Sequence, residues 1–275
     1  MRRSIFGGAT SLLLLLSAPG PGASQDDDAD CAQQDDPDRS IASCTRVLNN
    51  VNKNAHDRAA AYSNRGLAWH NKHKRIRALA DHSEAVGLNP KLAPAYYGRG
   101  VVWSEEGDVE RAIADYTEAI RLQPNNATYY NERCWALAVA DRDLQLALAD
   151  CTEALRLEPN DASMLDSRGF VYLRLGRPAE AVADYDAALK ISPNEAQSLF
   201  GRGIAKLRSG DMTGGGADLA AAKAIKPRIA EKFFRYGVFS PLITITGSGP
   251  RGPGRAPVKT WLHGTGQVAP RFRIR

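Results

Sequence analysis

Apolar and small residues recur at helical spacing through most of the chain. Ala112, Tyr116 and Ala119 stand four and three positions apart, which places them on one face of a helix. Upstream, Trp103 belongs to a second stretch of helical spacing, and the turn residue Gly107 separates the two stretches. The pattern predicts two helices joined by a short turn.

This two-helix pattern repeats along the chain. An Arg followed by a small residue recurs every 34 or 35 residues, and each unit ends with a Pro that stops its second helix. One such unit cannot bury both of its apolar faces alone, but stacked units can bury them against each other. The five units are 59–92, 93–126, 127–161, 162–195 and 196–229.

The units resemble the tetratricopeptide repeat, a helix–turn–helix of 34 residues. The resemblance rests on the small residues Gly100, Ala112 and Ala119, on the aromatic residues Trp103 and Tyr116, and on the closing Pro. It covers 171 of the 275 residues. It implies an all-α fold, a right-handed α-solenoid, whose concave groove is lined by the first helices and holds peptides or partner proteins.

The segments that flank the repeats are predicted to be caps. Residues 37–58 match the second helix of a unit after a stunted first helix, so we expect an N-terminal half-repeat. Residues 25–36 are acidic and are expected to be solvated. Residues 230–240 are expected to form a C-terminal capping helix over the last unit. Three Gly at 214–216 predict that this last unit opens first.

The N-terminal end has the pattern of a secretory signal peptide. Residues 1–24 begin with a basic pair and continue into a short apolar stretch and then small residues. An uncleaved, disordered leader is the alternative. The apolar stretch is too short for a stable membrane anchor, so we expect no transmembrane segment after signal removal.

The C-terminal end is basic. Residues 241–275 are rich in Gly and Pro and carry six Lys and Arg and no acid, so they are expected to be a disordered tail; a misread chain end is another explanation. Residues 25–240 hold 28 Lys and Arg against 31 Asp and Glu. The net charge of +5 therefore belongs to the two ends, and the repeats give little reason to expect a nucleic-acid partner.

Four cysteines in a chain predicted to be periplasmic or secreted indicate disulfides. Cys134 and Cys151 lie on the two helices of one unit, and Cys31 and Cys44 straddle the turn of the half-repeat. We expect the pairs Cys31–Cys44 and Cys134–Cys151. The alternative is that Cys134 and Cys151 are reduced residues that fill space in the core.

An Arg precedes the small residue of each first helix, and an Asp precedes the aromatic position of each second helix. We expect the two to pair within their own unit as structural ion pairs, because a planar guanidinium satisfies a carboxylate with two hydrogen bonds. The tetratricopeptide family usually has an apolar residue at the Arg position, so the Arg departs from its pattern. The expected pairs are Arg65 with Asp81, Arg99 with Asp115, Arg133 with Asp150, Arg168 with Asp184, and Arg202 with Asp218.

Residues just after the small position, and residues one turn earlier, are expected to face the groove. Their apolar side chains suit a helical or extended segment of a partner, although packing between neighbouring first helices is the alternative. Two Arg near the groove edge are expected either to bind an acidic ligand or to be solvated. The candidate partner-binding residues are Tyr97, Val101, Trp135, Phe170, Arg174, Phe200, Ile204 and Arg208, and Asn131 and Asp166 share the earlier position.

The sequence has no motif for a phosphate-binding loop, a nucleophile elbow or a zinc protease. His70, His73 and His82 are read as a solvated turn in preference to a metal site. We therefore expect no catalytic residue, no metal and no cofactor. The predicted function is an exported, non-catalytic scaffold for protein–protein interactions. The alternative is an envelope-associated assembly factor whose basic tail binds anionic lipid or polymer.

Overall fold

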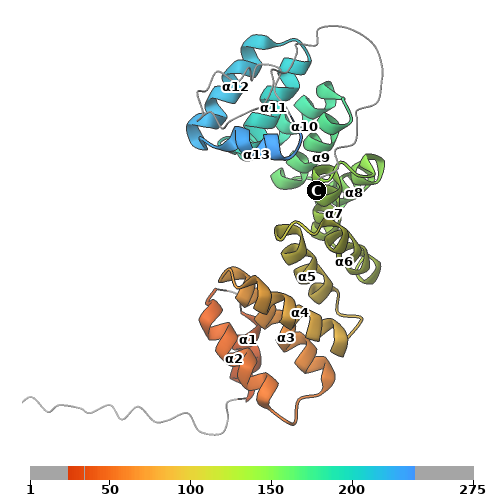
Figure 1. The fold of residues 1–275 in the computed structure, drawn as a ribbon, viewed down its shortest axis with the longest axis vertical. Coiled ribbons are helices and arrows are strands. Elements are labelled where there is room, and N and C mark those ends of the chain that lie inside the picture. Colours follow the sequence, from red (N-terminus) through yellow and green to blue (C-terminus); the bar gives the residue numbers. More distant parts are fainter. Residues whose placement is uncertain (1–23, 34, 239–275) are drawn as a thin grey trace, which may run out of the picture. The chain divides into compact units, whose positions relative to one another are not determined.

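Helices make up all the regular structure in the described part of the chain, which is residues 24–33 and 35–238 of the computed structural model. These residues form thirteen α-helices and no strand (Figure 1). Consecutive helices pack as neighbours, so the all-α solenoid expected from the repeat is confirmed. The predicted signal peptide, except for its last residue, and the predicted basic tail lie outside the described residues.

Each of the five sequence units contains one pair of helices. A further pair precedes them, and one short helix follows them. The pairs are α1 (Ser24–Ala32) with α2 (Pro37–Asn49), α3 (Ala55–Asn71) with α4 (Arg75–Leu88), α5 (Ala93–Glu105) with α6 (Val109–Leu122), α7 (Ala127–Val139) with α8 (Leu144–Leu157), α9 (Ala162–Arg174) with α10 (Pro178–Ile191), and α11 (Ala196–Arg208) with α12 (Met212–Ile225); α13 (Ile229–Arg235) closes the series.

A residue with left-handed backbone ends the first helix of every unit. At Gly107, for example, φ is +82°, and the next amide, that of Asp108, donates to the carbonyl of Trp103. This is the hydrogen-bond pattern that caps helix ends where Gly is favoured. The other four positions are His73, Asp141, Gly176 and Gly210. His73 therefore has a place in the turn of the first unit that needs no ligand.

Small residues let the two helices of a unit approach closely. A Cβ added to Gly100 would lie 2.8 Å from a ring carbon of Tyr116, which is fully buried. Ala112 and Ala119 are also fully buried. The ring of the second helix thus fills the space that the Gly of the first helix leaves open, which is efficient packing for a unit this thin.

The last unit contains the three Gly, and one of them has a clear packing role. Gly215 lies against the first helix of its unit: an added Cβ would be 2.8 Å from the carbonyl oxygen of Gly203. Asp211 caps α12 by accepting a hydrogen bond of 2.8 Å from the Gly214 amide. The expectation that this unit opens first stays a prediction.

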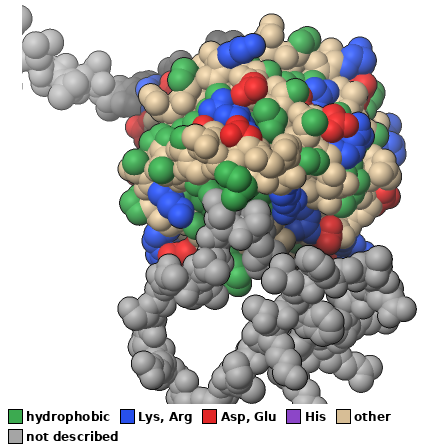
Figure 2. Space-filling view, turned by 90° about the horizontal axis from the view of Figure 1, so that it is seen from above, with side chains coloured by type: hydrophobic (Ala, Val, Ile, Leu, Met, Phe, Trp, Pro, Cys, Tyr) green, Lys and Arg blue, Asp and Glu red, His purple; other side chains and the backbone are tan. Residues whose placement is uncertain are grey.

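Charges of both signs are mixed on the surface. On the face shown in Figure 2, acidic and basic side chains are interspersed, with hydrophobic side chains between them. This agrees with the near balance of charges in residues 25–240. A face of this kind carries no one-signed field of the sort that attracts nucleic acid.

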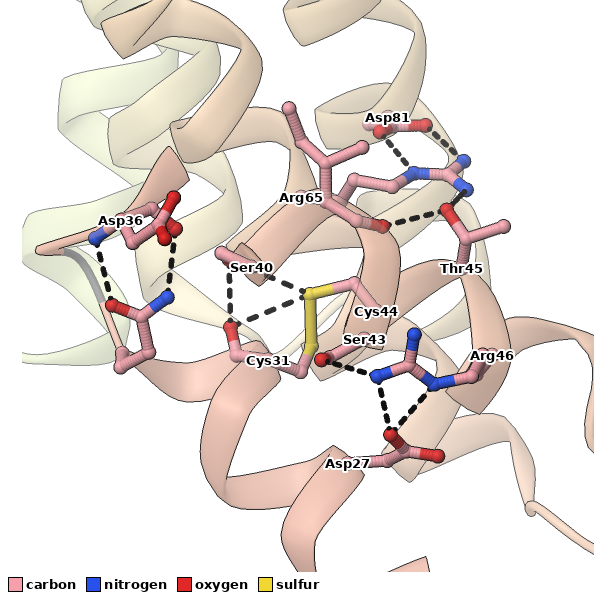
Figure 3. The surroundings of a disulfide bond; sticks show 12 residues. Asp27, Cys31, Asp36, Ser40, Ser43, Cys44, Thr45, Arg46, Arg65 and Asp81 are labelled. Carbon is pink, nitrogen blue, oxygen red and sulfur yellow. Dashed lines mark hydrogen bonds and ion pairs between the residues drawn. A yellow bond between two sulfur atoms is a disulfide. The ribbon is translucent and has the colours of Figure 1, made fainter. Parts of the chain in front are cut away.

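The acidic residues before the half-repeat differ from expectation, because they form α1, which packs on α2 and α3. Asp27 pairs with Arg46 at 2.7 Å (Figure 3), Asp30 pairs with Arg39, and Cys31 is buried. Asp28, Asp35 and Asp36 are exposed, in line with the expectation of solvated acids, but the sequence did not predict that the segment forms a helix with ion pairs to the rest of the chain. The partners of Asp27 and Asp30 are basic residues of the following helix.

Candidate partner-binding groove

The predicted groove residues of α5 and α7 stay partly accessible. Tyr97, Val101 and Trp135 are partly buried, and each lies on the first helix of its unit. The Tyr97 ring packs against Tyr129 with 5.0 Å between ring centroids. Burial raises the pKa of the Tyr97 hydroxyl to about 12, so that hydroxyl is neutral at physiological pH.

The predicted groove residues of α9 and α11 are buried by the chain's own last helix. Phe170, Phe200 and Ile204 are at most 1% exposed. The Phe233 ring of α13 lies 4.7 Å from the Phe200 ring and 6.0 Å from the Phe170 ring, centroid to centroid. These residues do not face an open groove, so the prediction that they bind a partner is wrong for this arrangement of the chain. The physical reason is that α13 covers Phe170 and Phe200, and Ile204 belongs to the same buried cluster.

The residues that follow α13 also contact helices outside the last unit. Tyr236, just beyond the helix, meets the Trp135 ring edge-on at 5.4 Å. Gly237 adopts φ +70°, and an added Cβ there would lie 3.0 Å from Nη1 of Arg174. The predicted capping helix therefore caps the last unit and reaches back to α7.

The two Arg at the groove edge are used inside the chain. Arg174 donates from Nη1 to the carbonyl of Tyr236 at 2.6 Å and pairs through Nη2 with Asp141 at 2.6 Å. Arg208 donates to the carbonyl of Leu173 at 2.8 Å. The Arg174 side chain is only 9% exposed, so it is neither solvated nor free for an acidic ligand.

An ionic ladder joins the two helices in each of the five units. In every unit the Arg donates from Nε and Nη2 to the two carboxylate oxygens of its Asp at 2.7–2.9 Å. The Asp residues are 3–7% exposed. Some Arg also reach the preceding unit, as Arg133 does through Thr117 Oγ1 at 3.1 Å. The pairs are Arg65–Asp81, Arg99–Asp115, Arg133–Asp150, Arg168–Asp184 and Arg202–Asp218.

Disulfides join the four cysteines in two pairs, Cys31 with Cys44 and Cys134 with Cys151. All four are buried. Beside the first disulfide, Ser40 Oγ donates to the Cys31 carbonyl at 3.1 Å (Figure 3). Each pair links the two helices of one hairpin, which is compatible with an oxidising compartment.

A polar pocket between α7, α9, α11 and α13 was not found from the sequence. Its cavity volume is about 380 Å³. Within it, the buried Asp166 accepts hydrogen bonds of 2.6 Å from Gln197 Nε2 and Ser198 Oγ. Burial raises the pKa of Asp166 to about 6 and also raises the pKa of Glu132. The charged and aromatic side chains in its lining are Glu132, Trp135, Asp166, Glu195 and Lys232.

The histidines of the first unit do not gather around one point. His70 Nε2 lies 3.0 Å from Glu105 Oε1, whereas His82 is buried with both ring nitrogens unpaired. Among the described residues, no group of three His, Cys, Asp or Glu is placed to hold a metal. None of the described helices is long and apolar enough to cross a bilayer.

Comparisons with known proteins agree with the repeat architecture. Two family models for the tetratricopeptide repeat match the chain, one over residues 93–126 and the other over residues 135–200. No curated protein sequence matches.

Solved structures of several repeat proteins are similar in fold. YrrB, described as a TPR protein with an unusual peptide-binding site, is 22% identical, with 68% of this chain and 94% of that chain covered and a TM-score of 0.56. MamA from Desulfovibrio magneticus RS-1 is 18% identical (62% and 95% covered, TM-score 0.55). A repeat protein from Parabacteroides merdae ATCC 43184 is 15% identical (76% and 85% covered, TM-score 0.60).

Proposed function

We propose that this chain, which contains tetratricopeptide repeats at residues 93–126 and 135–200, is an exported, non-catalytic scaffold that binds a protein or peptide segment in its groove. The binding surface is the open part of the first-helix face, formed by Tyr97, Val101 and Trp135. Proteins with these repeats generally mediate protein–protein interactions. One repeat protein of similar fold is itself described as having a peptide-binding site.

The observation that best supports this proposal is how α13 packs against the first helices α9 and α11. Its Phe233, with Tyr236 three residues later, inserts aromatic rings between the first helices α7, α9 and α11. Aromatic residues at this spacing form one face of a helix, and laying that face into an apolar groove is a common mode of recognition. The open part of the groove offers the same kind of surface to a segment of another protein.

Two observations support an exported location, periplasmic or secreted. The sequence begins with the pattern of a signal peptide. The two disulfides involve every cysteine of the chain. Disulfides persist in compartments that lack the reducing systems of the cytosol.

A peptide selection tests the binding surface. Peptides selected from a random display library on the wild-type chain are measured against Val101→Asp, which puts a charge on the open groove. Ile76→Asp is the matched control, because Ile76 lies on a second helix and is 86% exposed. We expect at least about tenfold weaker binding to Val101→Asp and unchanged binding to Ile76→Asp. Equal binding to both variants would argue against the groove as the site.

A second candidate function rests on the composition of residues 241–275, which hold six bases and no acid. Such a segment binds anionic membranes electrostatically, so the protein would associate with the envelope. The test is co-sedimentation with phosphatidylglycerol vesicles at low and high salt, with and without residues 241–275. Binding that is lost with the tail and screened by salt supports this candidate, and binding unaffected by the deletion removes it.

A further inference from the structure

We propose that the polar pocket between α7, α9, α11 and α13 binds a cationic group of the partner segment, a guanidinium or an alkylammonium, through Glu132, Asp166 and Asn131. The inference rests on the proposed function. Trp135 connects the two sites, because it lines the pocket and belongs to the open groove surface. A segment lying on the groove would therefore place a side chain in the pocket.

Two hydrogen-bond acceptors of α7 lack donors. Asn131 Oδ1 is buried and has no hydrogen-bond partner. Glu132 lines the pocket, and within the described part of the chain no group donates a hydrogen bond to its carboxylate or forms an ion pair with it. A buried carbonyl oxygen without a donor is costly, and the Glu132 carboxylate, which is partly buried, lacks a donor in the same pocket; together they indicate a missing donor group.

Asp166 provides a third acceptor that is held in place. It is 5% exposed, and Ser198 Oγ and Gln197 Nε2 each donate to one of its oxygens at 2.6 Å. Each carboxylate oxygen can accept more than one hydrogen bond, so capacity for a ligand remains. The donors come from α11, which fixes the carboxylate on α9 before any ligand arrives.

The charges of the lining favour a cation. Three carboxylates, of Glu132, Asp166 and Glu195, stand against one ammonium, that of Lys232. Lys232 Nζ donates to Gln197 Oε1 and forms no ion pair at contact distance with the three carboxylates, although the charges of Asp166 and Glu195 act on it. The Trp135 ring in the lining adds a surface on which a guanidinium or ammonium is favoured.

The test uses short probes on the full chain. Acetyl-Ala-Arg-Ala-amide and acetyl-Ala-Lys-Ala-amide carry the two cationic groups, and the citrulline analogue of the first is its uncharged counterpart. Binding is followed by the indole N–H resonance of Trp135, which Trp135→Phe identifies. We expect the Arg or the Lys probe to shift this resonance and the citrulline probe to bind at least about fivefold more weakly. Equal binding of all three probes, or no binding of either cation, would overturn the proposal.

Charge variants of the pocket give a second readout. Glu132→Gln keeps the shape of the side chain and should weaken binding of the cationic probe at least about fivefold. Lys232→Gln removes the competing ammonium and should strengthen binding of the same probe. Glu158→Gln is the matched control, because Glu158 is exposed and lies outside the pocket. Thermal melting checks that each variant is folded. Unchanged affinity in both pocket variants would also overturn the proposal.

The two proposals fail in different ways. Groove-selected peptides that lose affinity for Val101→Asp but bind wild type and Glu132→Gln equally would leave the scaffold function intact and remove the cation site. If the selected peptides bind Val101→Asp as tightly as wild type, the groove is not the binding site, regardless of how the small probes bind.

Discussion

The first-helix face of α5 and α7 and that of α9 and α11 are built on the same repeat positions but differ in accessibility. Trp135 on α7 and Phe170 on α9 hold equivalent positions, 35 residues apart. Trp135 is partly exposed, whereas Phe170 is 1% exposed. The same contrast separates Tyr97, which is partly exposed, from Phe200, which is fully buried.

The difference shows that residue type does not decide which groove positions are accessible. Aromatic side chains occupy both parts of the face, and what differs is whether another helix covers them. In the second part the cover is α13, whose Phe233 contacts the rings of Phe170 and Phe200. The covered part should therefore depend on α13 for its stability, while the part of the open face on α5, which has no contact with α13, should not.

Removing the central ring of α13 gives the largest expected effect. Phe233 is 1% exposed, so Phe233→Ala should cost about 3–5 kcal/mol by leaving a cavity and loosening α13. Hydrogen exchange should show lost protection in α9 and α11 and unchanged protection in α3 and α4. Tyr97→Ala, in the open part, is the comparison and should cost less than about 2 kcal/mol. Equal losses in the two variants would show that the two parts do not differ in this way.

The ionic ladder should behave alike in both parts, which is the second test. Arg99→Ala and Arg168→Ala each leave a buried Asp without its ion-pair partner, so each should cost about 3 kcal/mol in the free energy of unfolding, measured by urea denaturation. Arg121, whose side chain is 62% exposed and pairs with Glu118, is the control; Arg121→Ala should cost less than about 0.5 kcal/mol. A clearly smaller loss at Arg99 than at Arg168 would mean that the Arg–Asp pair contributes more to stability in the part that α13 covers.

Local features of the repeat could be predicted from the sequence because they recur at a fixed period. The helix pairs follow from the apolar spacing and the closing Pro. The pairing of Arg99 with Asp115 followed from the same logic, since one Arg and one Asp occur at fixed places in every unit. The position of the aromatic ring over a small residue, as with Tyr116 and Gly100, is found again with Tyr185 and Gly169.

Features that depend on non-repeating segments could not be predicted. α13 has seven residues and no counterpart in the repeats, so its pattern showed an apolar face but not which helices that face would cover. The polar pocket needs side chains from four helices, and of its lining residues the sequence placed only Asn131, Trp135 and Asp166 on the groove face. α1 is acidic, and its place in the fold depends on ion pairs with basic residues of later segments, such as Arg46.

A pH test concerns His82, which is buried on α4, the second helix of the first unit, far along the chain from the part that α13 covers. Burial lowers the pKa of His82 from 6.5 to about 4, with the charges of His70 and Arg99 adding to the effect. Between these values the unfolded chain binds a proton that the folded chain does not. Folding stability should therefore fall, by up to about 3 kcal/mol, as the pH drops from 6.5 to 4.

The variant His82→Phe isolates this contribution, since Phe fits a position that holds Tyr in other units. The difference in unfolding free energy between this variant and wild type should grow as the pH falls from 6.5 to 4. Comparing the two chains cancels the opposite trend of Asp166, whose pKa burial raises to about 6 and whose protonation favours the folded state. A difference that does not vary with pH would contradict the assignment.

The smallest effect concerns the Gly residues of the last unit in the covered part. Nothing lies within 4 Å of a Cβ added to Gly216, so Gly216→Ala should stabilise α12 by roughly 0.5–1 kcal/mol. Gly215→Ala is the matched change one residue earlier. Its Cβ would stand 2.8 Å from the Gly203 carbonyl oxygen, so this variant should lose about 1–3 kcal/mol. The effect of each variant is measured by the hydrogen-exchange protection of the amides in α11 and α12. If Gly216→Ala raises this protection, the backbone freedom of these Gly weakens the last unit. If the protection does not change, α13 already holds that unit closed.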